Sequence, residues 1–235
     1  MSMKPLDFDR RYGELDQVIR AYLGRSAEDG ESGEDEALEA YLRHTWHTRP
    51  WAVAIAGQQV REYARNPPGR LRRRLGEFYP VPDVGLPDAE IQGWLVRVAD
   101  RLERSVADGA VPPPSPPRTH WEWHARFPEL AQLLCGWFSQ DMPDEFPDHD
   151  SALYDYATTT DPQLVARAAG EARELGALFL DESECALALA ELGMEVEPPA
   201  PLSPSAWAAL LADRLLSLRA ADCGPPPEPS GPPEG

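Results

Sequence analysis

The sequence predicts an all-α fold of two homologous helical modules of about five helices each, joined by a Pro-rich linker. The first observation is a repeat, because W-x4-A-D-R-L occurs at Trp94–Leu102 and again at Trp207–Leu215, 113 residues later. The second is that apolar residues recur at helical spacing in both halves, while no alternating Val/Ile/Tyr-rich run is long enough to demand a sheet. The third is the proline-rich stretch 111–117, which is typical of a semi-rigid spacer.

The repeat extends well beyond this segment, in the same order and with small changes of offset. At an offset of 115, Leu15, Ile19, Tyr22, Leu23, Ala37, Leu38 and Tyr41 align with Leu130, Leu134, Trp137, Phe138, Ala152, Leu153 and Tyr156. At an offset of 112, Pro50, Val53, Arg61 and Glu62 align with Pro162, Val165, Arg173 and Glu174. We therefore expect a leader (1–13), a first repeat (14–107), a linker (108–118), a second repeat (119–223) and a disordered Pro/Gly tail (224–235).

Each helix of the first module has a local signal. Residues 15–24 carry an i, i+3, i+4, i+7, i+8 apolar stripe, and Gly24 suits the C-terminal end. Residues 37–46 form the next helix, and Pro50 opens a third that runs to Tyr63 and stops at the Asn-Pro-Pro-Gly sequence 66–69. A short basic helix over 70–77 and the helix that begins at Trp94 and runs to about 106 complete the module.

The second module repeats this order. Helices are predicted over 127–138, 150–158, 162–178, 182–193 and 204–220. Asp161-Pro162 and Ser203-Pro204 are favourable starts, because each puts a capping side chain just ahead of a first-turn proline. Short extended pieces are possible alternatives at 78–82 and 194–198 only.

Composition excludes several classes of protein. No apolar run approaches the ~20 residues of a membrane span, and no apolar signal-peptide core follows the first five residues. Three cysteines without C-x-x-C spacing suit reduced thiols in the cytoplasm. The absence of a P-loop, a G-x-G-x-x-G sequence and a nucleophile elbow predicts a non-enzymatic protein that needs no cofactor.

Charge differs sharply between the two halves. Residues 1–110 hold 16 Lys and Arg against 19 Asp and Glu, net −3, whereas the remainder holds 6 against 21, net −15. Phosphate binding needs clustered cations, so the acidic half is not expected to bind nucleic acid. An acidic face favours a basic protein partner instead.

The acidity is concentrated between residues 141 and 161, which hold seven carboxylates and no Lys or Arg: Asp141, Asp144, Glu145, Asp148, Asp150, Asp155 and Asp161. A paired-carboxylate hydrolase or a hard-cation site would look similar locally, although the Gly-bearing spacing of an EF-hand is missing. A solvated loop with acidic helix starts, or an anionic docking surface, would look the same. The first repeat favours these last two, because its matching loop keeps acidity without keeping every position: Ser26 and Asp29 align with Asp141 and Asp144.

Other polar clusters give weaker alternatives. His120 and His124 have the i, i+4 spacing that can place two imidazoles on one metal, and His44 and His47 form an H-x-x-H pair. Neither pair has the remaining ligands of a metal site, so surface or capping histidines are the simpler interpretation. Four arginines form the only basic cluster, at 70 and 72–74, and suit an exposed face better than nucleic-acid binding.

Parts of the second module resemble a known family. They are the stretch from Phe127-Pro128-Glu129-Leu130 to Gly136-Trp137-Phe138-Ser139-Gln140-Asp141, then Asp144-Glu145-Phe146, Asp161-Pro162, Glu171-x2-Glu174-Leu175 and the Trp207 segment. In order and spacing they resemble the immunity proteins of contact-dependent growth inhibition systems, which are small α-helical proteins. The first repeat departs from this pattern, since it has Leu-Gly-Arg-Ser at 23–26 in place of Phe-x-Gln-Asp.

The resemblance implies a cytoplasmic inhibitor that binds and neutralises a cognate antibacterial toxin domain, for which a basic nuclease is one expected class. Neither nucleic acid nor membrane is an expected partner. We expect the toxin to contact the acidic stretch, with the carboxylates pairing with Lys or Arg and one exposed tyrosine adding apolar contact. The predicted contact residues are Gln140, Asp141, Asp144, Glu145, Asp148, Asp150, Tyr154 and Asp155.

Two alternatives of other classes stay open from the sequence. One is a metal-dependent hydrolase that uses His120, His124 and the carboxylates from Asp141 to Asp150. The other is an acidic helical scaffold or nucleic-acid mimic that uses the acidic repeat.

Overall fold

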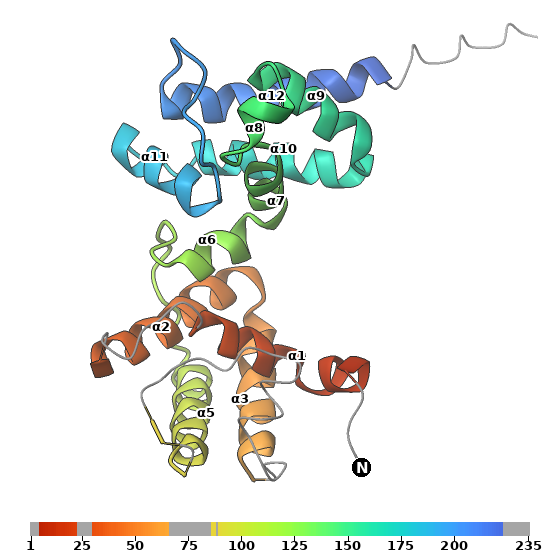
Figure 1. Ribbon diagram of the computed structural model, residues 1–235. Coiled ribbons are helices and arrows are strands. Elements are labelled where there is room, and N and C mark those ends of the chain that lie inside the picture. The colour runs from red at the N-terminus through yellow and green to blue at the C-terminus, as the bar shows by residue number, and fades with distance from the viewer. Residues whose placement is uncertain (1–4, 23–29, 66–85, 88, 223–235) are drawn as a thin grey trace, which may run out of the picture. The chain divides into compact units, whose positions relative to one another are not determined.

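The computed structural model describes residues 5–22, 30–65, 86–87 and 89–222, and within these ranges the protein is all-α, as predicted, with helices and no strand (Figure 1). No helix among these residues is long and apolar enough to cross a membrane. The chain divides into two compact units, Met1–Arg126 and Phe127–Gly235. Each unit is described by itself.

The first unit contains helices α1 (Pro5–Ala21), α2 (Gly30–Thr48), α3 (Pro50–Arg65), α5 (Ile91–Asp108) and α6 (His120–Arg126). Pro50 opens α3 because a first-turn proline loses no helical hydrogen bond. Gly109 ends α5 in a left-handed conformation (φ 61°), and its N–H bonds back to the carbonyls of Ser105 and Val106.

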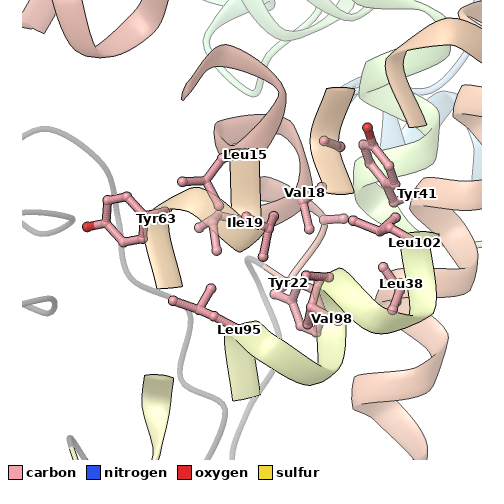
Figure 2. Close-up of a cluster of buried hydrophobic side chains, with 14 of the residues drawn as sticks. Leu15, Val18, Ile19, Tyr22, Leu38, Tyr41, Tyr63, Leu95, Val98 and Leu102 are labelled. Atoms are coloured by element: carbon pink, nitrogen blue, oxygen red, sulfur yellow. The ribbon is translucent and has the colours of Figure 1, made fainter. Parts of the chain in front are cut away.

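Helix α3 packs against α5, α1 and α2, and the apolar faces of these four helices meet in one core. Figure 2 shows these buried side chains pointing toward one another from all four helices. Trp94 is 3% exposed and meets Tyr22 edge-to-face, with ring centroids 5.1 Å apart. Gly57 lets α3 approach α5 closely, since a Cβ there would lie 3.3 Å from the Glu103 Cγ atom.

A buried ion pair joins α6 to the first unit. The Arg43 guanidinium donates to both carboxylate oxygens of Glu122 at 3.0 Å, and Glu122 also accepts the backbone N–H groups of Arg118 and Thr119. A charge this deeply buried is tolerated only when it is paired and hydrogen-bonded, as here. The sequence places residues 119–126 in the second repeat, whereas in the structure these residues pack within the first unit.

The second unit contains α7 (Pro128–Trp137), α8 (Met142–Glu145), α9 (His149–Thr159), α10 (Pro162–Gly176), α11 (Glu182–Glu191) and α12 (Pro204–Asp222). The cap expected before Pro162 forms, because the Asp161 carboxylate accepts the N–H of Gln163 at 2.7 Å. Asp181 and Glu184 form a reciprocal capping box at the start of α11.

Helix α10 occupies the centre of the second unit and packs against α12, α7 and α9. Trp207 of α12 is 1% exposed and meets Phe138 edge-to-face, with ring centroids 5.7 Å apart. Small residues of α10 face this contact, among them Ala168, Ala169 and Ala172, which are all buried. They allow the α10 and α12 backbones to approach closely.

The structure departs from the sequence expectation at the N-terminus. Residues 5–11, expected as part of a leader, are helical within α1, which is interrupted at Tyr12 by a non-helical backbone (φ −130°, ψ 25°). Tyr12 itself is buried and stacks edge-to-face on Tyr63, so core packing rather than local sequence orders this end. The basic helix expected at 70–77, the extended piece at 78–82 and the tail at 224–235 lie outside the described residues.

We predict that Trp94→Ala and Trp207→Ala each lower the free energy of unfolding by about 3–5 kcal/mol, because each leaves a large cavity in its unit. Trp51→Ala is the matched control, since Trp51 is 64% exposed and its loss should change stability by less than about 0.5 kcal/mol. Urea denaturation followed by circular dichroism measures both. A loss below about 1 kcal/mol for either buried tryptophan would contradict its place in the core.

Candidate functional site

The acidic stretch begins where α7 ends and covers the short helix α8 and the start of α9. Asp141, Asp144 and Glu145 are all exposed. Met142, between them, is buried and anchors α8 to the unit. No side-chain partner of these three carboxylates is found among the residues that the structure describes, so they face solvent with their charge uncompensated.

The other carboxylates of the stretch have structural partners within the unit. Asp148 accepts the N–H of Ser151 at 2.7 Å and caps α9; the side-chain and backbone hydrogen bonds from Ser151 lower its pKa. Asp150 pairs with Arg214 of α12 at 3.1 Å. Asp155 accepts the indole N–H of Trp137 at 2.9 Å and is half-buried. These three carboxylates therefore hold helices of the second unit together as well as adding negative charge to the surface.

The two tyrosines of α9 differ in exposure. Tyr156 is fully buried, whereas Tyr154, two residues earlier, is 60% exposed. Residues two apart lie on different faces of a helix, so only one of them can enter the core. Tyr154 is therefore available for contact, close in sequence to the acidic start of α9.

Two acidic residues that sequence reasoning missed join this surface. The backbone N–H of Glu195 donates to the carbonyl of Phe138 at 2.9 Å, and the Glu195 carboxylate accepts the N–H of Gln140 at 2.9 Å. His149 Nε2 lies 2.9 Å from the carbonyl oxygen of Glu197. The segment after α11 thus runs beside the end of α7 and the start of α9, and it brings exposed Glu195 and Glu197 to the acidic stretch.

Gly193 makes this close approach possible. Its φ is +96°, and a Cβ there would lie 2.8 Å from the Cβ of Cys135 on α7. Any other residue would force the 194–197 segment away from α7. We call the combined surface the acidic surface and define it by Gln140, Asp141, Asp144, Glu145, Asp148, Asp150, Glu195 and Glu197.

An exposed aromatic residue lies elsewhere in the same unit. Phe179, in the loop between α10 and α11, is 94% exposed and has a left-handed backbone (φ 54°), which a side chain of this size rarely adopts. Leu187 of α11 is 59% exposed. No periodic pattern in the sequence marks Phe179, because it stands in a loop.

The histidine pair lies in the first unit, whereas the acidic stretch lies in the second. The rings of His120 and His124 are adjacent, with centroids 4.3 Å apart, beside a cavity of about 250 Å³ that Arg20 also lines. The guanidinium of Arg20 disfavours a cation there. Among the described residues, no group of three or more His, Cys, Asp or Glu side chains is arranged to hold a metal ion.

Burial raises the pKa of one carboxyl group in the second unit, that of Glu171 on α10, to about 7. Its Oε2 atom accepts the N–H of Leu130 at 2.8 Å, and the carboxylate also accepts the N–H of Glu129. These two N–H groups belong to the first turn of α7, where Phe127 offers no side-chain cap. Glu171 is therefore a capping residue for α7 rather than an acid placed for catalysis.

Comparison with known proteins supplies the family. Residues 126–215 match the family model described as CdiI immunity protein. The match begins at the unit boundary and ends in α12 after the Trp207 segment, so it contains every residue of the acidic surface. No curated protein and no solved structure matches the chain. Residues 126–215, most of the second unit, are therefore similar to the CdiI immunity protein family.

Proposed function

We propose that this protein binds a cognate antibacterial toxin domain in the cytoplasm and neutralises it by occlusion, without catalysis, through the acidic surface of its second unit. The observation that carries the proposal is the coincidence of the family match with that surface. The partner is a protein with a basic face, for which a nuclease cleft is the expected class because it must attract phosphate.

The chemistry of the surface supports binding to a basic partner. Asp141, Asp144 and Glu145 are exposed on the short helix α8 and have no described side-chain partner, so pairing with Lys or Arg would cost no internal ion pair. Exposed pairs add little affinity one by one, but a field of one sign speeds diffusional encounter. Rapid capture suits an inhibitor that must bind an incoming toxin before the toxin acts.

The alternatives fit the described residues less well. A metal-dependent hydrolase needs a ligand set, and none is arranged among the residues that the structure describes. An acidic scaffold for a housekeeping complex would use the same charges, so geometry does not separate it from an immunity protein. Co-expression with the toxin domain encoded beside this gene does, because only an immunity protein restores growth and co-purifies with that toxin.

The sharpest test of the binding surface is the triple variant Asp141→Lys, Asp144→Lys and Glu145→Lys. These carboxylates have no described structural role, unlike Asp148, whose reversal would also remove the cap of α9. We expect the affinity for the toxin domain to fall at least about 100-fold, or about 2.7 kcal/mol, because three attractions become repulsions. Isothermal titration calorimetry measures this, and circular dichroism shows whether the fold is kept.

The matched control for the triple variant changes net charge equally on the first unit. Glu36→Lys, Glu90→Lys and Asp108→Lys replace three exposed carboxylates there. We expect this control to keep the affinity within about threefold, since these exposed charges lie outside the proposed contact surface and their field is screened by salt. Equal losses for the two variants would show that only total charge matters, and an unchanged affinity in the Asp141/Asp144/Glu145 variant would remove the acidic surface from the interface.

The association rate should depend strongly on salt. Steering by a field of one sign is screened as ionic strength rises, so we expect the rate to fall about tenfold or more from about 50 to about 500 mM NaCl. Stopped-flow fluorescence measures the rate, and the dissociation rate should change much less. A rate that is insensitive to salt would mean that apolar contacts, rather than the acidic surface, control encounter.

A further inference from the structure

We propose that residues 12–108 are a second copy of the immunity module, alike in its buried framework and diverged at its surface. The family match begins at residue 126 and does not reach this part of the chain. Four features of the two units, taken in turn, support the assignment. None of them is dictated by helix formation alone.

The first feature is the role of the repeated W-x4-A-D-R-L segment. In both units its tryptophan is buried, and its aspartate pairs with an arginine of the central helix. The Asp100 carboxylate forms an ion pair with the Arg61 guanidinium of α3, with an N–O distance of 2.5 Å. The Asp213 carboxylate pairs with the Arg173 guanidinium of α10 at 3.3 Å. Arg61 and Arg173 are themselves aligned by the repeat, at an offset of 112.

The second feature is the arginine that follows this aspartate. Arg101 pairs with Glu39 of α2 at 2.5 Å, and Arg214 pairs with Asp150 of α9 at 3.1 Å. The W-x4-A-D-R-L segment therefore makes the same kinds of contact in both units: its aspartate pairs with one neighbouring helix and its arginine pairs with another. Helical periodicity explains the buried positions of the repeat, but not these exposed ones.

The third feature is a half-buried hydrogen-bond acceptor in the first unit. Oε1 of Gln59 on α3 accepts the N–H groups of Glu14 and Leu15, at 2.9 and 3.0 Å. Both N–H groups follow Tyr12, whose non-helical backbone restarts the helix there. Gln59 thus caps an internal helix start from 45 residues away in the chain.

The second unit has the same arrangement at the aligned positions. Phe127, aligned with Tyr12, is buried and non-helical (φ −127°, ψ 55°). Glu171, aligned with Gln59, accepts the N–H groups of Glu129 and Leu130. In both units a side chain of the central helix accepts the same two successive backbone N–H groups, at aligned positions. This agreement favours descent of the two units from one module.

The fourth feature is a buried tyrosine in each unit. Tyr41 and Tyr156 are aligned by the repeat, and both are 0% exposed. Burial raises the pKa of both, and that of Tyr156 to about 12. The carboxylate of Glu14 adds to the rise for Tyr41, as the carboxylate of Glu129, at the aligned position, does for Tyr156. Each unit therefore buries a tyrosine close to the same aligned glutamate.

The surfaces, in contrast, have diverged. At the offset of 115, Asp141 aligns with Ser26, Glu145 with Gly30 and Asp148 with Gly33, whereas Asp144 and Asp150 align with aspartates at 29 and 35. Net charge is −3 for residues 1–110 against −15 for the remainder, so a basic toxin would be attracted more weakly to the first unit. Resting on the function proposed above, we infer that the two copies do not share a toxin partner.

One internal difference makes the equivalence testable. The acceptor is an amide in the first unit and a carboxyl in the second, where burial raises its pKa from 4.5 to about 7. The pKa of Glu171 is raised further by the carboxylates of Glu129 on α7 and Glu174 on α10. Tyr156 of α9 also faces Glu171. A raised carboxyl pKa favours the fold at low pH, and this stabilisation is lost as pH rises from 4.5 through 7.

The experiment is a reciprocal exchange in the full chain, Gln59→Glu with Glu171→Gln, followed by amide NMR from pH 5 to pH 9. In the unaltered protein we expect the Glu129 and Leu130 amides to shift with the titration of Glu171, while those of Glu14 and Leu15 do not shift. In the exchanged protein the titration should move to Glu14 and Leu15. If the Glu14 and Leu15 amide shifts do not change with pH when position 59 carries a carboxyl group, the equivalence of Gln59 and Glu171 is overturned.

A control and a second variant keep this test decisive. Gln58→Glu makes the same chemical change one position away from Gln59, and should not move either pair of amides as the exchange does. If the exchanged protein does not fold, Glu171→Gln alone still tests the claim, since it installs the first unit's residue. We expect its melting temperature at pH 8 to be no lower than that of the unaltered protein, and a clear decrease would contradict the inference.

Stoichiometry tests the divergence of the surfaces. With a catalytically inactive toxin domain as the probe, calorimetry should give one toxin per chain, bound at least about 100-fold more weakly by the Asp141/Asp144/Glu145 triple variant. Two toxins per chain would show that the first unit shares the partner. Failure of the unaltered chain to bind would contradict the proposed function, whereas the NMR exchange would still decide whether the first unit is a second copy.

Discussion

The second unit depends on how the start of α7 is held. This helix begins after Phe127 with no cap of its own, and Glu171 reaches from the central helix to accept the first backbone N–H groups. With its start fixed on α10, the helix ends where the acidic stretch begins. The acidic surface is therefore attached to packed helices rather than to a free loop. Such attachment reduces the entropy lost on binding a partner.

The distribution of partners among the carboxylates then explains how one stretch can serve both fold and function. Asp148 and Asp155 hold α9 and the end of α7 in place, while Asp141, Asp144 and Glu145 are exposed and, in the function proposed above, pair with the toxin. Catalysis would require convergent groups around a cavity, whereas these three side chains face solvent in the region that matches the immunity protein family model. The exposed charges therefore support the proposal of binding.

Local physics made much of this fold predictable. Apolar periodicity and the capping prolines located α3, α5, α7 and α9 to α12 to within about three residues, and Tyr154 is exposed as expected. The start of α2 and the short helices α6 and α8 were missed. Glu195 and Glu197 were missed, because they join the surface through hydrogen bonds that span more than 45 residues and through Gly193, whose role appears only in three dimensions. The helix before Tyr12 was missed for a similar reason.

The most direct test of the account is hydrogen–deuterium exchange, read by mass spectrometry, on the full chain with and without an inactive toxin domain. The account predicts slower exchange on binding in residues 139–150 and 194–197, with the first unit unchanged. Protection of 194–197 would be especially telling, because only the folded structure brings that segment to the acidic stretch. Protection confined to the first unit, or to α11 and α12, would contradict it.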